Sequence, residues 1–174
     1  MAERLTPPEI AGLLRAAAAM LAAELRGLPE ALLRFHPAAG QWCAKEVLGH
    51  LIEAERRGFA GRIRIILAER DPALAAWDQE AVARERRDCE RPLAVLLDEF
   101  MTMREASAAL VDRLGPADLS RGGHHPLVGY LTVADLTPEW VHHDRNHLRQ
   151  ILANVQAYVW PSMGNAQRFS ELEA

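Results

Sequence analysis

Apolar side chains recur along most of this chain at spacings of three and four, the period of an amphipathic helix. The first such segment follows Thr6, has proline at its first helical position, and stops at Gly27. The second runs from Cys43 to Arg70 without proline. Its expected inward face carries small or apolar residues, namely Cys43, Val47, Leu51, Ala54, Gly58, Gly61 and Ile65. Both segments therefore predict long helices.

Two further helices are predicted in the second half of the chain. One opens at Pro92 and reaches Gly115, and the other begins at Thr132 and continues to about Tyr158. Pro138 lies six residues into the last helix and removes one backbone hydrogen bond. We therefore expect this helix either to kink at Pro138 or to start only at Thr137.

The remaining segments contain no convincing alternation of period two and no internal repeat, and residues 71–80 and 120–130 are turn-rich. The sequence therefore predicts an all-α fold, an antiparallel four-helix bundle with short extra helical turns in its connections. We expect one domain over residues 1–158. Residues 159–174 form a polar C-terminal extension that is either poorly ordered or in contact with a partner.

Composition narrows the function classes. The 174 residues are 49% hydrophobic and carry a net charge of −4, with acids and bases interleaved, which argues against nucleic-acid or membrane binding. The densest basic run, residues 83–91, also contains acids, and we interpret it as a solvated linker face. Two cysteines, Cys43 and Cys89, cannot build a disulfide framework. Without a targeting or membrane-spanning segment, we expect a cytoplasmic protein.

Histidines occupy positions where a bundle helix normally carries leucine. His143 and His147 fall on the inward stripe of the last helix, whereas His142 falls on its flank. Residues four apart lie on nearly the same side of a helix, so these two rings can reach one point. His50 lies on the buried face of the second helix and can supply a third nitrogen. The alternative is that all three are hydrogen-bonded interior histidines.

Four stretches of the chain, WCAKEVLGHLIEAERRGFAGRI, DPALAAWDQEA, HHPLVGYLTVADL and HDRNHLRQI, occur in that order. Together they resemble the DinB/YfiT-like superfamily of four-helix-bundle metal-dependent hydrolases and thiol transferases, over roughly residues 8–157. The resemblance implies that His50, His143 and His147 bind a divalent metal and that the protein is a homodimer. Three neutral imidazoles suit Zn²⁺ or Ni²⁺. The family often has Ser or Thr where this chain has Cys43.

Three neutral ligands would leave the full charge on the metal ion, which lowers the pKa of bound water to about 7 or stabilises a thiolate. We therefore expect an enzyme that uses water or a low-molecular-weight thiol to attack a small electrophilic substrate. The alternative is a non-catalytic bundle that acts through binding or dimerisation, with or without a structural metal. Glu46 and Glu53 flank His50 by about one turn and are candidates for a proton acceptor, or else solvated helix charges.

Four residues are candidates for the walls of a substrate pocket: Trp77, Trp140, His125 and Gln150. The alternative for the two tryptophans is ordinary core packing, since buried tryptophans usually have that role. The expected dimer has a candidate surface in the small residues of the first helix, which permit close helix approach; these are Ala17, Ala18, Ala19, Ala22 and Ala23. The same alanines can instead simply pack inside one chain.

Overall fold

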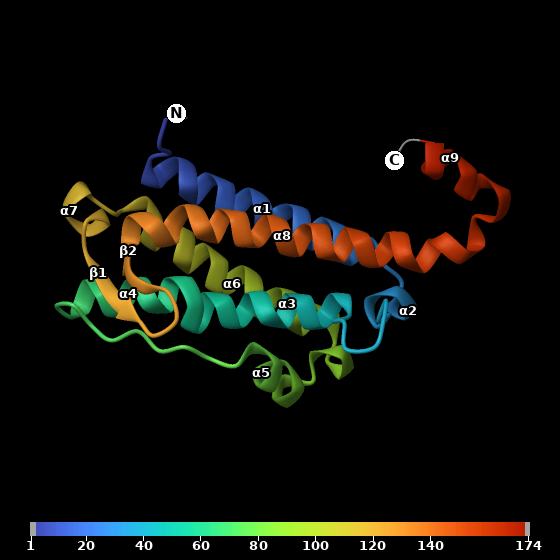
Figure 1. Ribbon diagram of the computed structural model, residues 1–174, viewed down its shortest axis with the longest axis horizontal. Coiled ribbons are helices and arrows are strands. Elements are labelled where there is room, and N and C mark those ends of the chain that lie inside the picture. The colour runs from blue at the N-terminus through green and yellow to red at the C-terminus, as the bar shows by residue number, and fades with distance from the viewer. Residues whose placement is uncertain (1–2, 173–174) are drawn as a thin grey trace.

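The computed structural model describes residues 3–172 and confirms the predicted helical bundle (Figure 1). Three long helices are continuous: α1 (Pro7–Gly27), α6 (Leu93–Asp112) and α8 (Val133–Val159). The fourth long segment has three parts, α3 (Ala44–Glu53), the π-helical turn η1 (Ala54–Gly58) and α4 (Phe59–Ala68). In Figure 1, α1 and α8 lie side by side along one edge, with α3 and α4 along the other.

Short helical elements fill the connections. They are α2 (Glu30–Leu33), α5 (Gln79–Arg86), the 3₁₀ turn η2 (Asp88–Glu90) and α7 (Pro116–Leu119). The C-terminal extension is also helical as far as the structure describes it, with η3 (Trp160–Ser162), η4 (Gly164–Ala166) and α9 (Gln167–Leu172). Within residues 3–172, no helix has the length and apolarity needed to cross a membrane.

The connection expected to be turn-rich and irregular contains a short two-stranded hairpin at residues 122–132. β1 (Gly122–His125) pairs antiparallel with β2 (Gly129–Thr132), and the backbone of Ala73 bridges to His124. Gly123 permits this close approach, because a Cβ there would lie 2.7 Å from the carbonyl oxygen of Pro72. Glycine and histidine have little strand propensity, so β1 carried no strand signal, and β2 is only four residues long although it contains Tyr130 and Thr132. The hairpin pins the segment after α4 against the bundle.

The inward face of the second long segment changes phase at the π-helical turn. Up to Gly58 the predicted inward positions are buried, but Ile65, also predicted to face inward, is 39% exposed. Ile63 and Ile66 are buried instead. A π-helical turn contains one extra residue relative to an α-helical turn, so the positions that follow it rotate to a new side. The helical period predicted from sequence therefore fails after η1.

The last long helix begins where its capping residues predict and not at Thr137. Asp135 accepts hydrogen bonds from the backbone and hydroxyl of Thr132, which forms a capping box, and α8 starts at Val133. Pro138 lies inside the helix. The neighbouring Thr137 hydroxyl donates to the carbonyl oxygen of Val133 at 3.2 Å. The delayed start predicted from Pro138 is therefore wrong. His143 lies well inside α8, more than two turns after its first residue.

A polar layer separates two apolar parts of the core. One cluster contains Trp140 and the other contains Ile151, and the residues between them on α8 include His143, Asp144 and His147. At the same level of α6, Arg104 is 1% exposed. Its guanidinium donates to Glu55 at 2.6 Å, to Asp144 and to the carbonyl oxygen of Leu14 at 3.0 Å. This buried network was not predicted from sequence.

The interpretation of residues 83–91 as a solvated linker face is wrong for the part of the run that packs against α3. Arg86 donates to Asp88 at 2.6 Å and to Glu53 at 2.8 Å, and both carboxylates are buried. Asp88 packs directly on Gly49, where an added Cβ would lie 1.8 Å from its carboxylate oxygen. The run therefore forms an ion-pair network against the outer side of α3.

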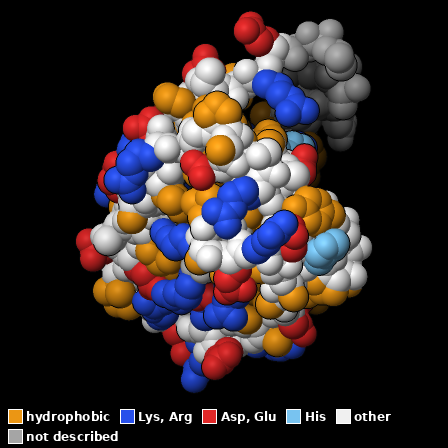
Figure 2. All heavy atoms as spheres, turned by 90° about the vertical axis from the view of Figure 1, so that its left-hand side faces the viewer, with side chains coloured by type: hydrophobic (Ala, Val, Ile, Leu, Met, Phe, Trp, Pro, Cys, Tyr) orange, Lys and Arg blue, Asp and Glu red, His pale blue; other side chains and the backbone are white. Residues whose placement is uncertain are grey.

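The surface carries charges of both signs. On the face shown in Figure 2, Lys and Arg side chains are interspersed with Asp and Glu over the end of the bundle. This face therefore does not present the continuous basic surface that binding to a phosphate backbone requires.

Candidate metal centre

The structure brings together the side chains of His50 from α3 and of His143 and His147 from α8. One ring nitrogen from each lies within 4.8 Å of the other two. The Nε2 atoms of His50 and His143 are 3.0 Å apart, and the ring centroids of His147 lie 4.5 Å from both other rings. We call these three residues the histidine triad. Their nitrogens converge between α3 and α8, and His50 and His143 are 93 residues apart in sequence.

Gln150 determines the tautomer of His147. The Nδ1 atom of His147 lies 2.9 Å from the side-chain oxygen of Gln150. An amide oxygen only accepts hydrogen bonds, so Nδ1 carries the proton and Nε2 keeps a free lone pair. Gln150 therefore acts on the triad from one helical turn away, as the ligand-orienting partners of metal sites do.

Burial keeps the triad neutral. Removal from water lowers the pKa of both His50 and His143 to about 3, and it also lowers the pKa of His147. At His50 and His143, protons therefore compete for the ring nitrogens only well below the ordinary imidazole pKa of about 6.5. Neutral imidazoles are the form that ligates Zn²⁺ and similar ions.

Two triad nitrogens have no hydrogen-bond partner. The buried Nδ1 atoms of His50 and His143 contact no donor or acceptor among the described residues. The Nε2 atoms of the same two rings face each other, so one must donate a proton to the other unless a cation lies between them. A cation that accepts all three Nε2 lone pairs fits this arrangement, because each Nδ1 then carries its proton.

Aromatic rings enclose the triad. Trp42 and Trp77 lie on His50, with ring centroids at 5.0 and 5.6 Å, and the Trp77 ring is stacked on it. Phe59 meets His143 edge-on at 5.1 Å. Sequence reasoning identified Trp77 but missed Trp42 and Phe59. The position of Trp42 just before the helix that carries His50 could have indicated its contact with that ring. No sequence feature indicated the contact of Phe59 with His143.

A cavity of about 530 Å³ adjoins the triad, since Phe59 and Trp77 line it and also touch the histidine rings. Arg62 and His125 supply polar groups to this cavity. The guanidinium of Arg62 donates to Nε2 of His125 at 3.0 Å, and burial lowers the pKa of both groups. His125 therefore lies at the cavity, as does Trp77, and Arg62 is an additional residue that the sequence did not indicate.

Trp140 does not line this cavity. It is fully buried and stacks on Phe59 at 5.2 Å, on the side of that ring that belongs to the core. Its indole Nε1 has no hydrogen-bond partner among the described residues. The structure therefore gives Trp140 the role of ordinary core, which was the alternative interpretation from sequence.

The two candidate carboxylates are engaged elsewhere. Glu46 accepts the backbone N–H of Cys43 at 2.8 Å, and Glu53 is buried in ion pairs with Arg57 at 2.6 Å and Arg86 at 2.8 Å. Glu53 is thus not a solvated helix charge. Among the residues the structure describes, no carboxylate or cysteine joins the triad within 4.8 Å. A fourth ligand position would therefore be open to water or substrate.

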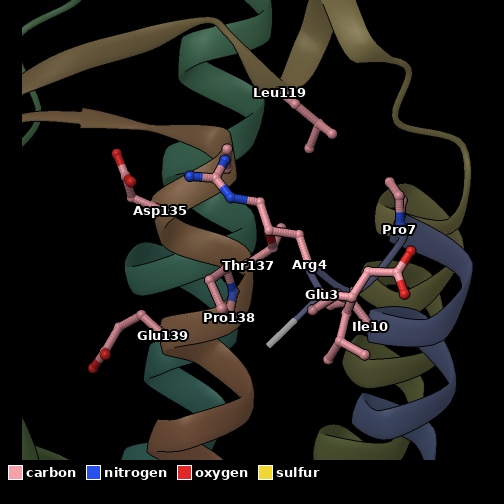
Figure 3. A pocket seen from close by; sticks show the side chains of 11 residues that line it. Glu3, Arg4, Pro7, Ile10, Leu119, Asp135, Thr137, Pro138 and Glu139 are labelled. Atoms are coloured by element: carbon pink, nitrogen blue, oxygen red, sulfur yellow. The ribbon is translucent and has the colours of Figure 1, made fainter. Parts of the chain in front are cut away.

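A cavity larger than the one beside the triad lies elsewhere in the protein. It measures about 640 Å³ and is formed where the N-terminal end of α1 meets the start of α8 (Figure 3). Arg4, Asp135 and Glu139 contribute charge, and Ile10 and Leu119 contribute apolar surface. None of the residues lining it is a histidine or cysteine. Size alone therefore does not identify the chemical site.

Comparisons with known proteins identify the family of this chain. The family model of the DinB superfamily matches residues 13–151. A protein of Oceanobacillus iheyensis named "Putative metal-dependent hydrolase" is 22% identical over 122 residues, 70% of each chain. A Bacillus mycoides protein with the same descriptive name is 24% identical over 140 residues, 80% of each chain.

A solved structure shares the fold. It is described as "YfiT from Bacillus subtilis is a probable metal-dependent hydrolase with an unusual four-helix bundle topology". The TM-score is 0.80 at 19% sequence identity, and the match covers 90% of this chain and 91% of the other. Its likeness establishes the bundle topology of the present chain.

Proposed function

Because this chain belongs to the DinB superfamily, we propose that it is a metal-dependent enzyme whose ion is held by His50, His143 and His147. The observation that carries the proposal is the convergence of three neutral ring nitrogens within 4.8 Å, with no fourth His, Cys, Asp or Glu among the described residues completing the set. Three nitrogen ligands and an open position are typical of catalytic zinc sites. Zn²⁺ and Ni²⁺ both suit imidazole ligands.

A bound divalent ion would supply the positive charge that makes water or a low-molecular-weight thiol nucleophilic near neutral pH. The chain itself orients and encloses the site. Gln150 holds the ring of His147, and Trp42, Trp77 and Phe59 limit the access of bulk water. The adjoining cavity suits a small, largely apolar electrophile, and its polar lining consists of Arg62, His125, Asp135 and Glu139.

Metal content of tag-free protein tests the ligand set. The wild-type chain should retain about one equivalent of metal, and the double variant His143→Ala, His147→Ala should retain none, because two of three protein ligands are lost. His142→Ala is the matched control, since His142 is exposed on the same helix and should not affect binding. Stoichiometric metal in the double variant would refute the assignment.

A screen of small esters, amides and thiol-reactive electrophiles then tests catalysis. Metal-loaded wild type should accelerate the attack of water or of a thiol, and His50→Ala should abolish the acceleration while the helical circular dichroism is kept. A non-catalytic bundle with a structural metal is the alternative. Metal binding with no activity toward any electrophile, with or without thiol, would favour it.

A further inference from the structure

A second cluster of reactive side chains lies at the N-terminal end of α3, two helical turns from His50. It consists of Cys43, Cys89, His36 and Glu46, and one potential ligand atom from each lies within 4.8 Å of the others. The residues come from three segments: the connection after α2, the start of α3, and η2. The sulfur atoms of Cys43 and Cys89 are 2.8 Å apart although the residues are 46 positions apart in sequence.

The two thiols have different surroundings. Cys43 is fully buried, and burial raises the pKa of its thiol. Cys89 is partly exposed, and its sulfur lies 3.6 Å from Nε2 of His36. The Nδ1 atom of His36 is 2.8 Å from the carbonyl oxygen of Gln41 and must donate to it. Nε2 of His36 therefore has a free lone pair beside Cys89.

We propose that Cys89 and Cys43 form an oxidisable dithiol, a modification site at which a hydroperoxide converts the pair to a disulfide. Nε2 of His36 accepts the proton of Cys89, and the thiolate attacks one oxygen of the hydroperoxide. The sulfur–oxygen bond forms as the oxygen–oxygen bond breaks, and the leaving oxygen takes a proton to become water or an alcohol. Cys89 is then a sulfenic acid.

Cys43 completes the reaction. Its sulfur attacks the sulfur of the Cys89 sulfenic acid, the disulfide bond forms, and the sulfur–oxygen bond breaks. The departing oxygen takes the proton of Cys43 and leaves as water. Two thiols and one hydroperoxide thus give one disulfide, one water and one further water or alcohol, with two electrons passing from the sulfurs to the oxygen–oxygen bond.

The geometry favours a disulfide over a second metal site. Two thiolates on one tetrahedral zinc ion lie about 3.7 Å apart, given zinc–sulfur bonds of about 2.3 Å. The sulfurs of Cys43 and Cys89 are already closer than that. The cluster is thus arranged for sulfur–sulfur bonding.

Thiol counting tests the proposal on the full reduced chain. After treatment with one equivalent of hydrogen peroxide, the remaining thiols are alkylated in denaturant and the intact mass is measured. The wild type should carry two alkyl groups before oxidation and none after it. A wild type that keeps both thiols under excess peroxide would overturn the proposal.

The single variants separate the two roles. Cys43→Ser keeps a good helix-capping residue, so it should fold, and it should accumulate a sulfenic acid at Cys89 that dimedone traps. Cys89→Ser leaves only the buried Cys43, which should stay reduced while the wild type is fully oxidised. Equal oxidation rates in the two variants would contradict the assigned order. So would binding of a zinc equivalent that disappears in both variants.

The role of His36 has its own readout. His36→Ala should slow the oxidation of Cys89 at least tenfold, and added imidazole should restore the rate, because His36 is exposed and free imidazole can replace it. His124→Ala is the control, since His124 is exposed and belongs to the hairpin. Slowing without rescue would mean that His36 does not accept the proton. The thiol count does not depend on any activity at the histidine triad.

Discussion

Gln150 is the one side chain outside the triad that hydrogen-bonds a triad histidine among the described residues. His147 is the triad member whose Nδ1 proton has an acceptor among the described residues, whereas the Nδ1 atoms of His50 and His143 have none. Loss of such a partner lowers metal affinity because the ring is no longer held in the ligating tautomer. Loss of Gln150 should therefore affect the site more than loss of one partner would in a site where all three histidine rings have a hydrogen-bond partner at Nδ1.

Replacement of Gln150 by leucine should weaken metal binding about 10–100-fold, the usual effect of removing such a partner. Competition with a chromophoric chelator measures the change. Gln156→Leu, an exposed position on the same helix, is the matched variant and should bind as the wild type does. If the two variants have the same affinity, Gln150 does not orient His147.

Titration of the triad predicts a pH dependence of stability. His50 and His143 have a pKa of about 3 in the folded protein and about 6.5 in an unfolded chain. Above about pH 6.5 both histidines are neutral in the folded and in the unfolded protein, so the free energy of unfolding does not depend on their titration. As pH falls below this value, only the unfolded chain binds the protons, and stability should decrease by about 1.4 kcal/mol per pH unit for each histidine.

Urea unfolding of chelator-treated protein between pH 7 and pH 5 measures this slope. His50→Gln should reduce it, and His124→Ala should leave the contribution of the triad intact, because His124 is exposed and belongs to the hairpin. A free energy of unfolding that rises as pH falls through this range would show that the triad histidines are not buried in their neutral form.

Some residue roles were accessible from sequence and others were not. The period of the last helix placed His143 and His147 on one side, and Gln150 follows His147 by one turn. Phe59 and Arg62 have no such signal, because their contacts with the triad and its cavity depend on how separate segments pack. Arg104 did leave a trace, as a charged residue between Phe100 and Ala108 on an apolar face.

Among the elements, the π-helical turn η1 marks the point after which helical periodicity no longer predicts which residues are buried. The pattern from Cys43 to Gly58 is regular and correctly predicts burial, but one extra residue in the turn rotates everything that follows. The hairpin escaped prediction for another reason, because its first strand is built from glycine and histidine. Both elements depend on tertiary packing more than on local preference.

Gly61 tests the π-helical turn. A Cβ at this position would lie 2.2 Å from the backbone oxygen of Arg56, so Gly61→Ala should destabilise the protein by about 1–3 kcal/mol through overpacking. Gly12→Ala in α1 is the control, since a Cβ there has open space and should stabilise by about 0.5–1 kcal/mol. Urea midpoints measure both. Equal shifts would mean that the turn relaxes at no cost.

At the scale of the whole molecule, the homodimer expected from sequence stays a prediction. Three of the alanines proposed for its interface, Ala17, Ala18 and Ala22, are buried inside the chain. The remaining candidate surface is a groove between α1 and α8, lined in part by Met20 and Leu152, each 42% exposed.

Light scattering at micromolar concentration should give twice the 19.3 kDa of one chain. Leu152→Asp should shift the mass to that of a monomer if the groove is the interface, while circular dichroism stays unchanged. A monomeric wild type would rule the dimer out. A dimer that survives the substitution would place the interface elsewhere on the surface.

Arg104 has a consequence for how the bundle moves. Its guanidinium joins α6 to α1 through the carbonyl oxygen of Leu14, to η1 through Glu55 and to α8 through Asp144. A helix that swung outward at this level would leave a buried charge without its partner, at a cost of about 3–5 kcal/mol. The four long segments are therefore locked to one another beside the histidines. The connection after α4 and the hairpin form part of the cavity wall through Trp77, His125 and Leu127, so a small molecule would enter past these segments and without the parting of helices.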